Sequence, residues 1–387
     1  MEVANREQVL AFRLAGHNLA RRLPPGSLLE AAAARGIQNT PPGSAELALQ
    51  ARVTDLTPAQ LEQALVVDKT LLQLWSIRHS PLFFPTSDAA VFTIGLLPVS
   101  EDEESFRFYL PKLGPVLDEM GMSAREAEER VATAAYIALD GKVLSKAELS
   151  TVLGQHLPEK LLPWCAPCGS HHVSETQFRR VAWRGLLCFT PREGSKPSFI
   201  RTDQWLGHSL AQSSPAVAQA ELVRRYLRCY GPSTAANFEE WAGIAPAQAR
   251  SSWQLLKDEL LEISFEGKKL WLHQSDLKRF NSSSTLDRVR LLPPHDAYLF
   301  QSDRTLLLPD KALHSQVWRA LTNPGVVLVD GQIAATWRTQ KKGKRLLLTV
   351  TFLRPFSPDV RAEVEAEAAL LAPFRACQSV EVEFSQI

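Results

Sequence analysis

Five cations crowd one short segment near the C-terminus, and their spacing suits contacts with a polyanion. From Gly331 to Arg354 the chain carries six Lys or Arg and no Asp or Glu. Five of these cations surround Gly343 between two apolar stretches: Arg338, Lys341, Lys342, Lys344 and Arg345. The pattern predicts a β-hairpin with a cationic tip that pairs with phosphates and releases their counterions. An ordinary solvated turn is the alternative, and the lack of local acids favours contact with nucleic acid.

Two cysteines and two histidines form a second group that could do chemistry. Cys165 and Cys168 are separated by two residues, and His171 and His172 follow closely. The group could be a thioredoxin-like redox motif, a zinc site or a plain reduced loop. A redox motif needs a helix that starts at its first cysteine, and structural zinc sites usually have ligand pairs that lie far apart. We therefore favour the plain loop and expect neither a metal nor a cofactor.

Asp296 is an isolated carboxylate within a Pro-His-Asp-Ala-Tyr string. It could be a functional carboxylate, or it could cap a loop and pair with Arg304. We favour the structural role. The sequence contains no glycine-rich phosphate loop, no Gly-x-Ser-x-Gly nucleophile and no His-Glu-x-x-His metal helix.

Length and composition are those of a globular protein with two or three folding units. The chain has 387 residues, of which 45% are hydrophobic and 22% charged, with a net charge of +1. A near-neutral total leaves nucleic-acid binding open, because binding needs a local basic surface. We find no apolar run of about 18 residues and no secretory signal. Five cysteines are too few for a disulfide framework. We expect a cytoplasmic, nucleoid-associated monomer without membrane contact.

The order of elements that must position these groups recurs along the chain. Helical periodicity covers residues 220–230, 233–241 and 245–259, and a hairpin follows at 261–265 and 269–272. This order is typical of a winged helix, which is a helix-turn-helix with an attached strand pair. Less complete copies precede it. We therefore predict an α+β fold of tandem winged helices with a β-rich C-terminal domain, divided at 1–120, 121–215, 216–280 and 281–387.

Finer predictions concern both ends of the chain. One helix is expected over residues 6–23, followed by strands at 71–77 and 81–85. A polar linker at 281–285 leads into strands at 290–292, 298–300, 326–329, 333–337 and 346–352. A helix over 358–374 and a strand over 380–384 complete the predicted C-terminal domain.

Several strings in this sequence resemble one known family. Glu-Leu-Val-Arg-Arg-Tyr-Leu-Arg-Cys-Tyr-Gly-Pro-Ser-Thr at 221–234, Val-Arg-Leu-Leu-Pro-Pro-His-Asp-Ala-Tyr-Leu at 289–299, Val-Asp-Gly-Gln-Ile-Ala-Ala-Thr-Trp-Arg at 329–338 and Gly-Leu-Leu-Cys-Phe at 185–189 are similar to the AlkZ/YcaQ family. Its best-known members are bacterial DNA glycosylases that unhook alkylated bases and interstrand crosslinks. The resemblance implies three tandem winged helices and a β-rich part that form a channel around duplex DNA.

The resemblance also implies a catalytic motif, which this chain carries in altered form. The family has Gln-x-Gln or Gln-x-Asp shortly after its early helices, and here Gln38-Asn39-Thr40 stands at that place. Gln38 matches the first glutamine, whereas Thr40 replaces the second polar arm. Such a trio can hydrogen-bond a water but supplies no base. Arg78 and His79 align with a stretch near the family's active cleft, where His79 could donate to a phosphate or a base. A polar loop is the alternative there.

Two functional hypotheses follow. The first is a monofunctional DNA glycosylase that binds duplex DNA and acts on alkylated or crosslinked bases. The second is a non-enzymatic winged-helix DNA-binding protein, either a regulator or a lesion sensor. The identity of the residues in Gln38-Asn39-Thr40 separates the two hypotheses. An enzyme with an unrelated site at the cysteine-histidine loop is a weaker third possibility.

Overall fold

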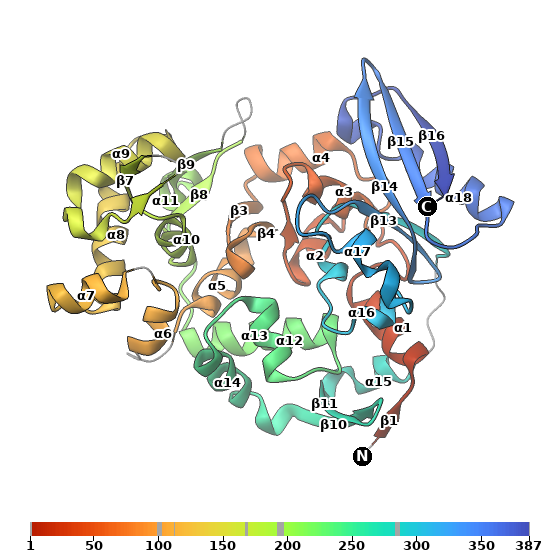
Figure 1. The fold of residues 1–387 in the computed structure, drawn as a ribbon, viewed down its shortest axis with the longest axis horizontal. Coiled ribbons are helices and arrows are strands. Elements are labelled where there is room, and N and C mark those ends of the chain that lie inside the picture. Colours follow the sequence, from red (N-terminus) through yellow and green to blue (C-terminus); the bar gives the residue numbers. More distant parts are fainter. Residues whose placement is uncertain are drawn as a thin grey trace. The chain divides into compact units, whose positions relative to one another are not determined.

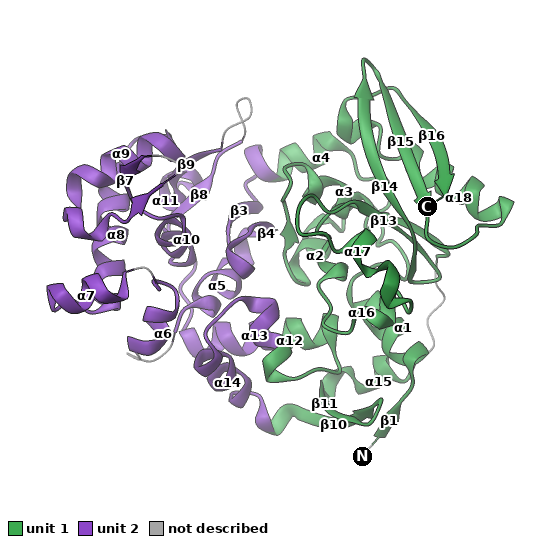
Figure 2. Cartoon of the chain, viewed as in Figure 1, with its two compact units in different colours: residues 1–64, 224–237, 258–387 green, residues 65–223, 238–257 purple. Residues whose placement is uncertain are grey.

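The elements of the chain are arranged in two compact units, each made of discontinuous segments. The computed structural model describes residues 2–98, 103–111, 113–166, 169–191, 197–282 and 287–386. Unit 1 comprises residues 1–64, 224–237 and 258–387, and unit 2 comprises residues 65–223 and 238–257 (Figure 2). The four predicted segments are shorter than these units, and their boundaries stay a prediction.

Unit 1 contains the early helices, a small sheet and a larger C-terminal sheet (Figure 1). The small sheet has the order β1-β10-β11, with β1 (Glu2–Ala4) parallel to β10 (Leu260–Phe265) and β11 (Lys268–His273) antiparallel to it. The helices that lie wholly within unit 1 are α1 (Arg6–Gly16), α2 (Leu28–Ala33), α3 (Ser44–Gln50), α4 (Pro58–Glu62), α15 (Leu277–Phe280), α16 (Arg304–Leu307), α17 (His314–Val317) and α18 (Pro358–Ala369). A short strand, β2 (Ile37–Gln38), lies between α2 and α3 along the chain.

The larger sheet of unit 1 has five strands in chain order, from β12 to β16. They are β12 (Val289–Leu292), β13 (Gly325–Val329), β14 (Gln332–Lys342), β15 (Arg345–Phe352) and β16 (Ser379–Gln386). The first four are antiparallel, and β16 is parallel to β15. The predicted C-terminal strands at 290–292, 326–329, 333–337, 346–352 and 380–384 are thereby confirmed. The two faces of the sheet belong to different cores, since Val327 packs with Val364 of α18 while Leu328 packs with Leu14 of α1.

Unit 2 is mainly helical with short strands. β3 (Leu71–Trp75) pairs antiparallel with β4 (Pro81–Pro85), which confirms the predicted strand at 81–85 and most of the one at 71–77, whose last residue instead begins a 3-10 turn over Ile77–His79. A second small sheet has the order β5-β9-β8, made of β5 (Leu144–Ser145), β8 (Leu187–Phe189) and β9 (Ser198–Arg201). The helices are α5 (Ala89–Phe92), α6 (Glu103–Phe108), α7 (Gly114–Met120), α8 (Ala124–Ala138), α9 (Lys146–His156), α10 (Glu175–Trp183), α11 (Thr202–Leu206) and α14 (Pro246–Gln254). Residues 192–196, between β8 and β9, lie outside the described residues, as do Cys168 and most of the predicted linker at 281–285.

Two helices contribute residues to both units. They are α12 (Pro215–Tyr230) and α13 (Ala235–Ala242). Along the chain, α12, α13, α14, β10 and β11 follow the predicted order of helices and hairpin, although α14 ends at Gln254 rather than at residue 259. The mixed helix and strand content confirms the α+β class, whereas the winged-helix arrangement stays a prediction. No helix within the described ranges is both long and apolar enough to cross a bilayer.

Three predicted elements near the chain ends were wrong in detail. Helix α1 stops at Gly16 instead of Leu23, because Asn18 adopts a positive φ of 55° that turns the chain. The expected strand at 298–300 is a 3-10 turn over Ala297–Leu299, because the Asp296 side chain accepts a hydrogen bond from the Tyr298 N–H at 2.9 Å. Helix α18 ends at Ala369, and a separate 3-10 turn over Pro373–Arg375 follows it.

Candidate functional site

The altered motif lies in a loop of unit 1 between β2 and α3, which we call the motif loop (residues 38–43). Asn39 is buried and holds this loop in shape. Its Oδ1 accepts hydrogen bonds from the backbone N–H groups of Gly43 at 2.8 Å and Ala45 at 3.4 Å. These are the N-terminal groups that a helix cannot satisfy internally. Asn39 is therefore committed to the start of α3, and its amide oxygen is not available to position a water.

Gln38 and Thr40 flank this structural residue. Gln38 is 9% exposed at the end of β2 and takes part in a further interaction, whereas Thr40 is exposed. The two positions differ in what they can do. The Gln38 amide lies in a mostly dry setting, where a hydrogen bond is electrostatically stronger, while the Thr40 hydroxyl meets solvent. Gln38 is accordingly the better placed of the two to orient a water.

A buried ion pair fixes the far end of α3. Arg52 donates to both carboxylate oxygens of Asp296, at 2.7 and 2.8 Å, and both side chains are 0% exposed. The Arg52 Nε also donates to the His17 carbonyl at 2.9 Å. Asp296 thus has the structural role that we favoured, with Arg52 rather than Arg304 as its partner. A fully satisfied pair at this depth is costly to break on one side only.

Arg375 joins the motif loop to the cationic hairpin. Its Nη2 donates to the Gly43 carbonyl at 3.3 Å, and its own carbonyl accepts a hydrogen bond from the Lys341 Nζ at 3.0 Å. The same core that contains Leu47 of α3 also contains Trp337 of β14. The structure therefore brings Gln38, Asn39, Thr40 and the hairpin into one unit, linked by a shared core and by the hydrogen bonds of Arg375. Sequence reasoning missed Arg375, which lies over 330 positions from Gly43.

The predicted cationic hairpin is confirmed as β14 and β15. Lys342 and Arg345 pair across the tip, and Gly343 begins the two-residue turn with a φ of 62° that glycine adopts without strain. Three of its cations have partners, which are Thr322 O for Arg338 at 2.9 Å, Arg375 O for Lys341 and Glu381 for Arg345 at 2.7 Å.

Lys342 and Lys344 are the free charges of this hairpin. Both side chains are exposed, and neither ammonium has an ion-pair or hydrogen-bond partner within the described part of the chain. Such solvated ammonium groups can pair with phosphates without first breaking an internal contact. The hairpin therefore presents two available charges at its tip and a partly neutralised base.

Glu46 is a half-buried carboxylate shortly after the motif loop. It lies in the first turn of α3, with its Oε2 3.8 Å from the Arg375 Nη1. Burial raises the pKa of this carboxyl above its usual value, and the nearby Arg375 charge opposes that shift. A raised pKa is a common property of carboxylates that act as general bases, so Glu46 is a candidate for that role. The sequence held a signal for it, because Glu46 is the only acidic residue between Gly36 and Gln50.

A buried arginine without a hydrogen-bond partner among the described residues lies just before β2. Arg35 is 1% exposed, and none of its three guanidinium nitrogens has a hydrogen-bond partner among the described residues. Burial and then the Arg52 charge lower the pKa of Arg35 to about 10, so it remains cationic at neutral pH. His17 is also fully buried, and burial followed by the Arg35 charge holds its pKa well below the ordinary value. One uncompensated positive charge therefore lies three residues before Gln38.

Arg78 and His79 belong to unit 2, where both adopt positive φ angles of 52° and 55°. Arg78 donates to the Trp241 carbonyl at 2.7 Å. His79 stacks on Trp183, with ring centroids 4.4 Å apart and an interplanar angle of 2°. Burial, and then the charge of Arg180, lower the pKa of His79 to about 3. The imidazole is therefore neutral at physiological pH and cannot attract a phosphate by charge, although a neutral ring can still donate one hydrogen bond.

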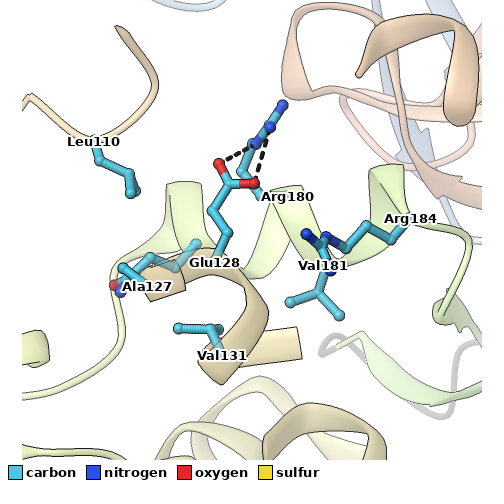
Figure 3. Close-up of a pocket in the computed structure, with 8 residues that line it drawn as sticks. Leu110, Ala127, Glu128, Val131, Arg180, Val181 and Arg184 are labelled. Atoms are coloured by element: carbon cyan, nitrogen blue, oxygen red, sulfur yellow. Dashed lines mark hydrogen bonds and ion pairs between the residues drawn. The ribbon is translucent and has the colours of Figure 1, made fainter. Parts of the chain in front are cut away.

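A small cavity in unit 2 does not add a ligand site. It lies beside Arg180 and Glu128, which form two hydrogen bonds of 2.7 and 2.9 Å between α10 and α8 (Figure 3). Its open space is roughly that of one water molecule, too small for a nucleobase. Its remaining lining residues are Leu110, Ala127, Val131, Gln177, Val181 and Arg184.

Comparison with known proteins gives one consistent result. The family model described as DNA glycosylase AlkZ-like matches residues 31–374. The interstrand DNA cross-link repair glycosylase of Streptomyces sahachiroi is 27% identical over 346 residues, which cover 86% of this chain and 88% of that protein. The solved structure of Streptomyces sahachiroi DNA glycosylase AlkZ aligns with a TM-score of 0.77 and 25% identity, covering 99% of this chain and 100% of that chain.

Proposed function

This chain belongs to the AlkZ-like DNA glycosylase family, and we propose that it is a DNA-repair glycosylase that removes alkylated or crosslinked purines from duplex DNA. The observation that carries the proposal is the connection between the motif loop and the cationic hairpin through Arg375. A DNA backbone held by Lys342 and Lys344 would thereby be held by the same compact unit that contains Gln38.

The chemistry that this arrangement supports is hydrolysis of an N-glycosidic bond. An N7-alkylguanine carries a positive charge, so the C1′–N bond breaks as the base takes the bonding electrons and leaves neutral. A water oxygen then bonds to C1′ and loses a proton. Gln38 orients this water, and the Glu46 carboxylate accepts the proton directly or through solvent. The field of Arg35 favours anionic groups such as the DNA backbone close to the motif strand.

The substitution at the second arm of the motif restricts the substrate class. Thr40 has a shorter side chain than Gln or Asp, and the Asn39 amide is committed to the backbone. Cationic lesions leave with little assistance, so one well-placed Gln38 suffices for them. Neutral lesions need acid or electrostatic help at the leaving base, and we expect them to be inert.

The test is excision from duplexes that contain N7-methylguanine, scored as abasic sites. The parent protein should release the base, and Gln38→Ala should slow release by about 100-fold or more, as loss of a preorganised polar group does. Gln274→Ala is a matched control, because it removes an exposed glutamine of the same unit. Excision that is unchanged in Gln38→Ala would show that the motif is not the site.

A non-enzymatic DNA-binding role is the second candidate. It is favoured because the Asn39 side-chain oxygen already accepts hydrogen bonds from two backbone N–H groups and cannot position a water. It predicts that the parent binds duplex DNA without releasing any base. Thr40→Gln and Thr40→Asp distinguish two reasons for such inactivity. A gain of excision in either variant would mean that the pocket persists and only the second arm has been lost. No excision in all three proteins, with intact DNA binding, would establish the binding role.

A further inference from the structure

Leu321 is the most exposed large hydrophobic side chain within the described ranges. It is 81% exposed, in the segment of unit 1 between α17 and β13. A side chain this exposed contributes little to the stability of the fold. Single apolar residues are common on protein surfaces, so exposure by itself assigns no role. Two further features set Leu321 apart, which are the fixed conformation of its loop and the position of that loop beside the cationic hairpin.

Hydrogen bonds hold the loop of residues 319–323, which we call the anchored loop. The Asn323 Oδ1 accepts a hydrogen bond from the Arg319 backbone N–H at 2.8 Å. On the other side, the Arg338 Nη2 of β14 donates to the Thr322 carbonyl at 2.9 Å. Thr322 has a φ of 46°, a left-handed conformation that turns the chain directly after Leu321. The backbone around Leu321 is therefore already ordered, which lowers the entropic cost of using this side chain in binding.

The register of the sheet places the anchored loop at the foot of the hairpin. Gly325 pairs with Trp337, so the loop joins β13 at the level beyond which β14 pairs only with β15. Side chains alternate between the two faces of a strand. Trp337 packs in the core that contains α18, so Arg338, Gln340 and Lys342 share the opposite face. We call these three exposed residues the β14 strip, which extends about 13 Å from the anchored loop to the hairpin tip.

The charge around Leu321 suits a polyanion. From Lys311 to Arg345 the sequence contains one acidic residue, Asp330, and it lies at the end of β13 away from the anchored loop. Arg338 is exposed and uses only its Nη2 to hold the loop, among the described residues, so its other nitrogens can donate to a phosphate. An apolar side chain surrounded by cations matches duplex DNA, which has an anionic exterior and an apolar base stack.

We propose that Leu321 is a wedge that enters the base stack of duplex DNA while the β14 strip holds the neighbouring phosphates. Proteins that kink duplexes insert leucine and other apolar side chains between base pairs, beside Arg and Lys that contact the groove. Separating two base pairs exposes a nucleotide to a site that acts on it. The inference rests on the DNA-repair function proposed above, and it names the residue that opens the stack.

The experiment follows the fluorescence of aminopurine, a base analogue that brightens when it is unstacked. The duplex contains aminopurine beside a tetrahydrofuran abasic analogue and is saturated with the full-length protein, so no base needs to be excised. The parent should raise the fluorescence, Leu321→Ala should lose most of this rise, and Leu321→Met should keep it. Leu370→Ala is the matched control, because it removes an exposed leucine of the same unit after α18 and should behave as the parent does.

Affinities separate the wedge from the electrostatic contacts. On an intact duplex, Leu321→Ala should bind as the parent does and with the same salt dependence, because phosphate contacts dominate that affinity. On the abasic duplex it should bind about tenfold more weakly, the factor expected when one leucine side chain is no longer buried. Its melting temperature should be unchanged, since Leu321 is exposed, and this measurement detects any folding defect.

Several outcomes would overturn the wedge. They are an absence of any rise in the parent, an equal rise in Leu321→Ala, and an equal loss in Leu370→Ala. Loss of self-association in Leu321→Ala with unchanged fluorescence would also overturn it, because Leu321 would then contact a second copy of the chain. A parent that unstacks DNA through Leu321 but releases no purine supports the wedge and contradicts only the glycosylase activity.

Discussion

Lys342→Ala together with Lys344→Ala should weaken DNA binding in a way that depends on salt. Both ammonium groups are exposed and unpaired within the described residues, so each can neutralise one phosphate. Each neutralised phosphate contributes about −0.9 to the slope of log K against log salt, and the pair therefore contributes about −1.8. On this basis the double variant should bind about 60-fold more weakly at 0.1 M salt.

The assay is a titration of a fluorescent undamaged duplex between 50 and 200 mM salt. Over this fourfold range the parent should lose about tenfold more affinity than the double variant. The melting temperature should hardly change, because exposed side chains without partners contribute little to stability. Lys341 and Arg345 are left in place, since one binds the Arg375 carbonyl and the other pairs with Glu381.

A charge-matched control separates the hairpin from the general charge of the protein. Lys278→Ala with Lys311→Ala removes the same charge from exposed positions elsewhere in unit 1. This control should keep the parent slope. If both double variants lower the slope equally, DNA binding is diffuse. If neither changes it, the hairpin is not the DNA contact.

Three further substitutions test the motif loop and the residues on either side of it. Asn39→Ala removes two hydrogen bonds at the start of α3 and should lower the free energy of unfolding by about 1–2 kcal/mol in urea titrations. An unchanged free energy would show that these hydrogen bonds do not stabilise the motif loop. Arg35→Met removes a buried charge that has no hydrogen-bond partner among the described residues, so it should raise the free energy of unfolding by about 1 kcal/mol or more; a large loss of stability would show that Arg35 makes a stabilising interaction. Glu46→Gln should abolish the fall in excision rate at low pH, because the rate of a carboxylate base is lost as pH drops through its raised pKa. The same raised pKa predicts stability that is present at low pH and lost as pH rises through it, so Glu46→Gln should not destabilise the protein at neutral pH.

Local signals were enough to predict the hairpin but not the site around it. Alternating apolar residues and Gly343 lie within one short stretch, so β14 and β15 follow from neighbours in the sequence. The expected strand at 298–300 failed because Asp296 is held by Arg52, a partner 244 positions away. The Arg375 connection was missed for the same reason, because its partner Gly43 is far away in the sequence and no local pattern of residues links the two positions. Asn39 was assigned to catalysis by the resemblance, and its actual bonds depend on a loop conformation that single residue types do not reveal.

The buried pair of Arg52 and Asp296 also sets an order of events during synthesis. Ribosomes add about 5–20 residues per second, so the 244 residues between the two partners take roughly 12–50 s to emerge. During that time Arg52 has no Asp296 to pair with, and α3 lacks most of its sheet because β13 to β15 lie after Asp296 in the chain. The first 64 residues must therefore wait in an unfinished state while unit 2 can already fold. A nascent chain halted before Asp296 should be a preferred target for chaperones and proteases.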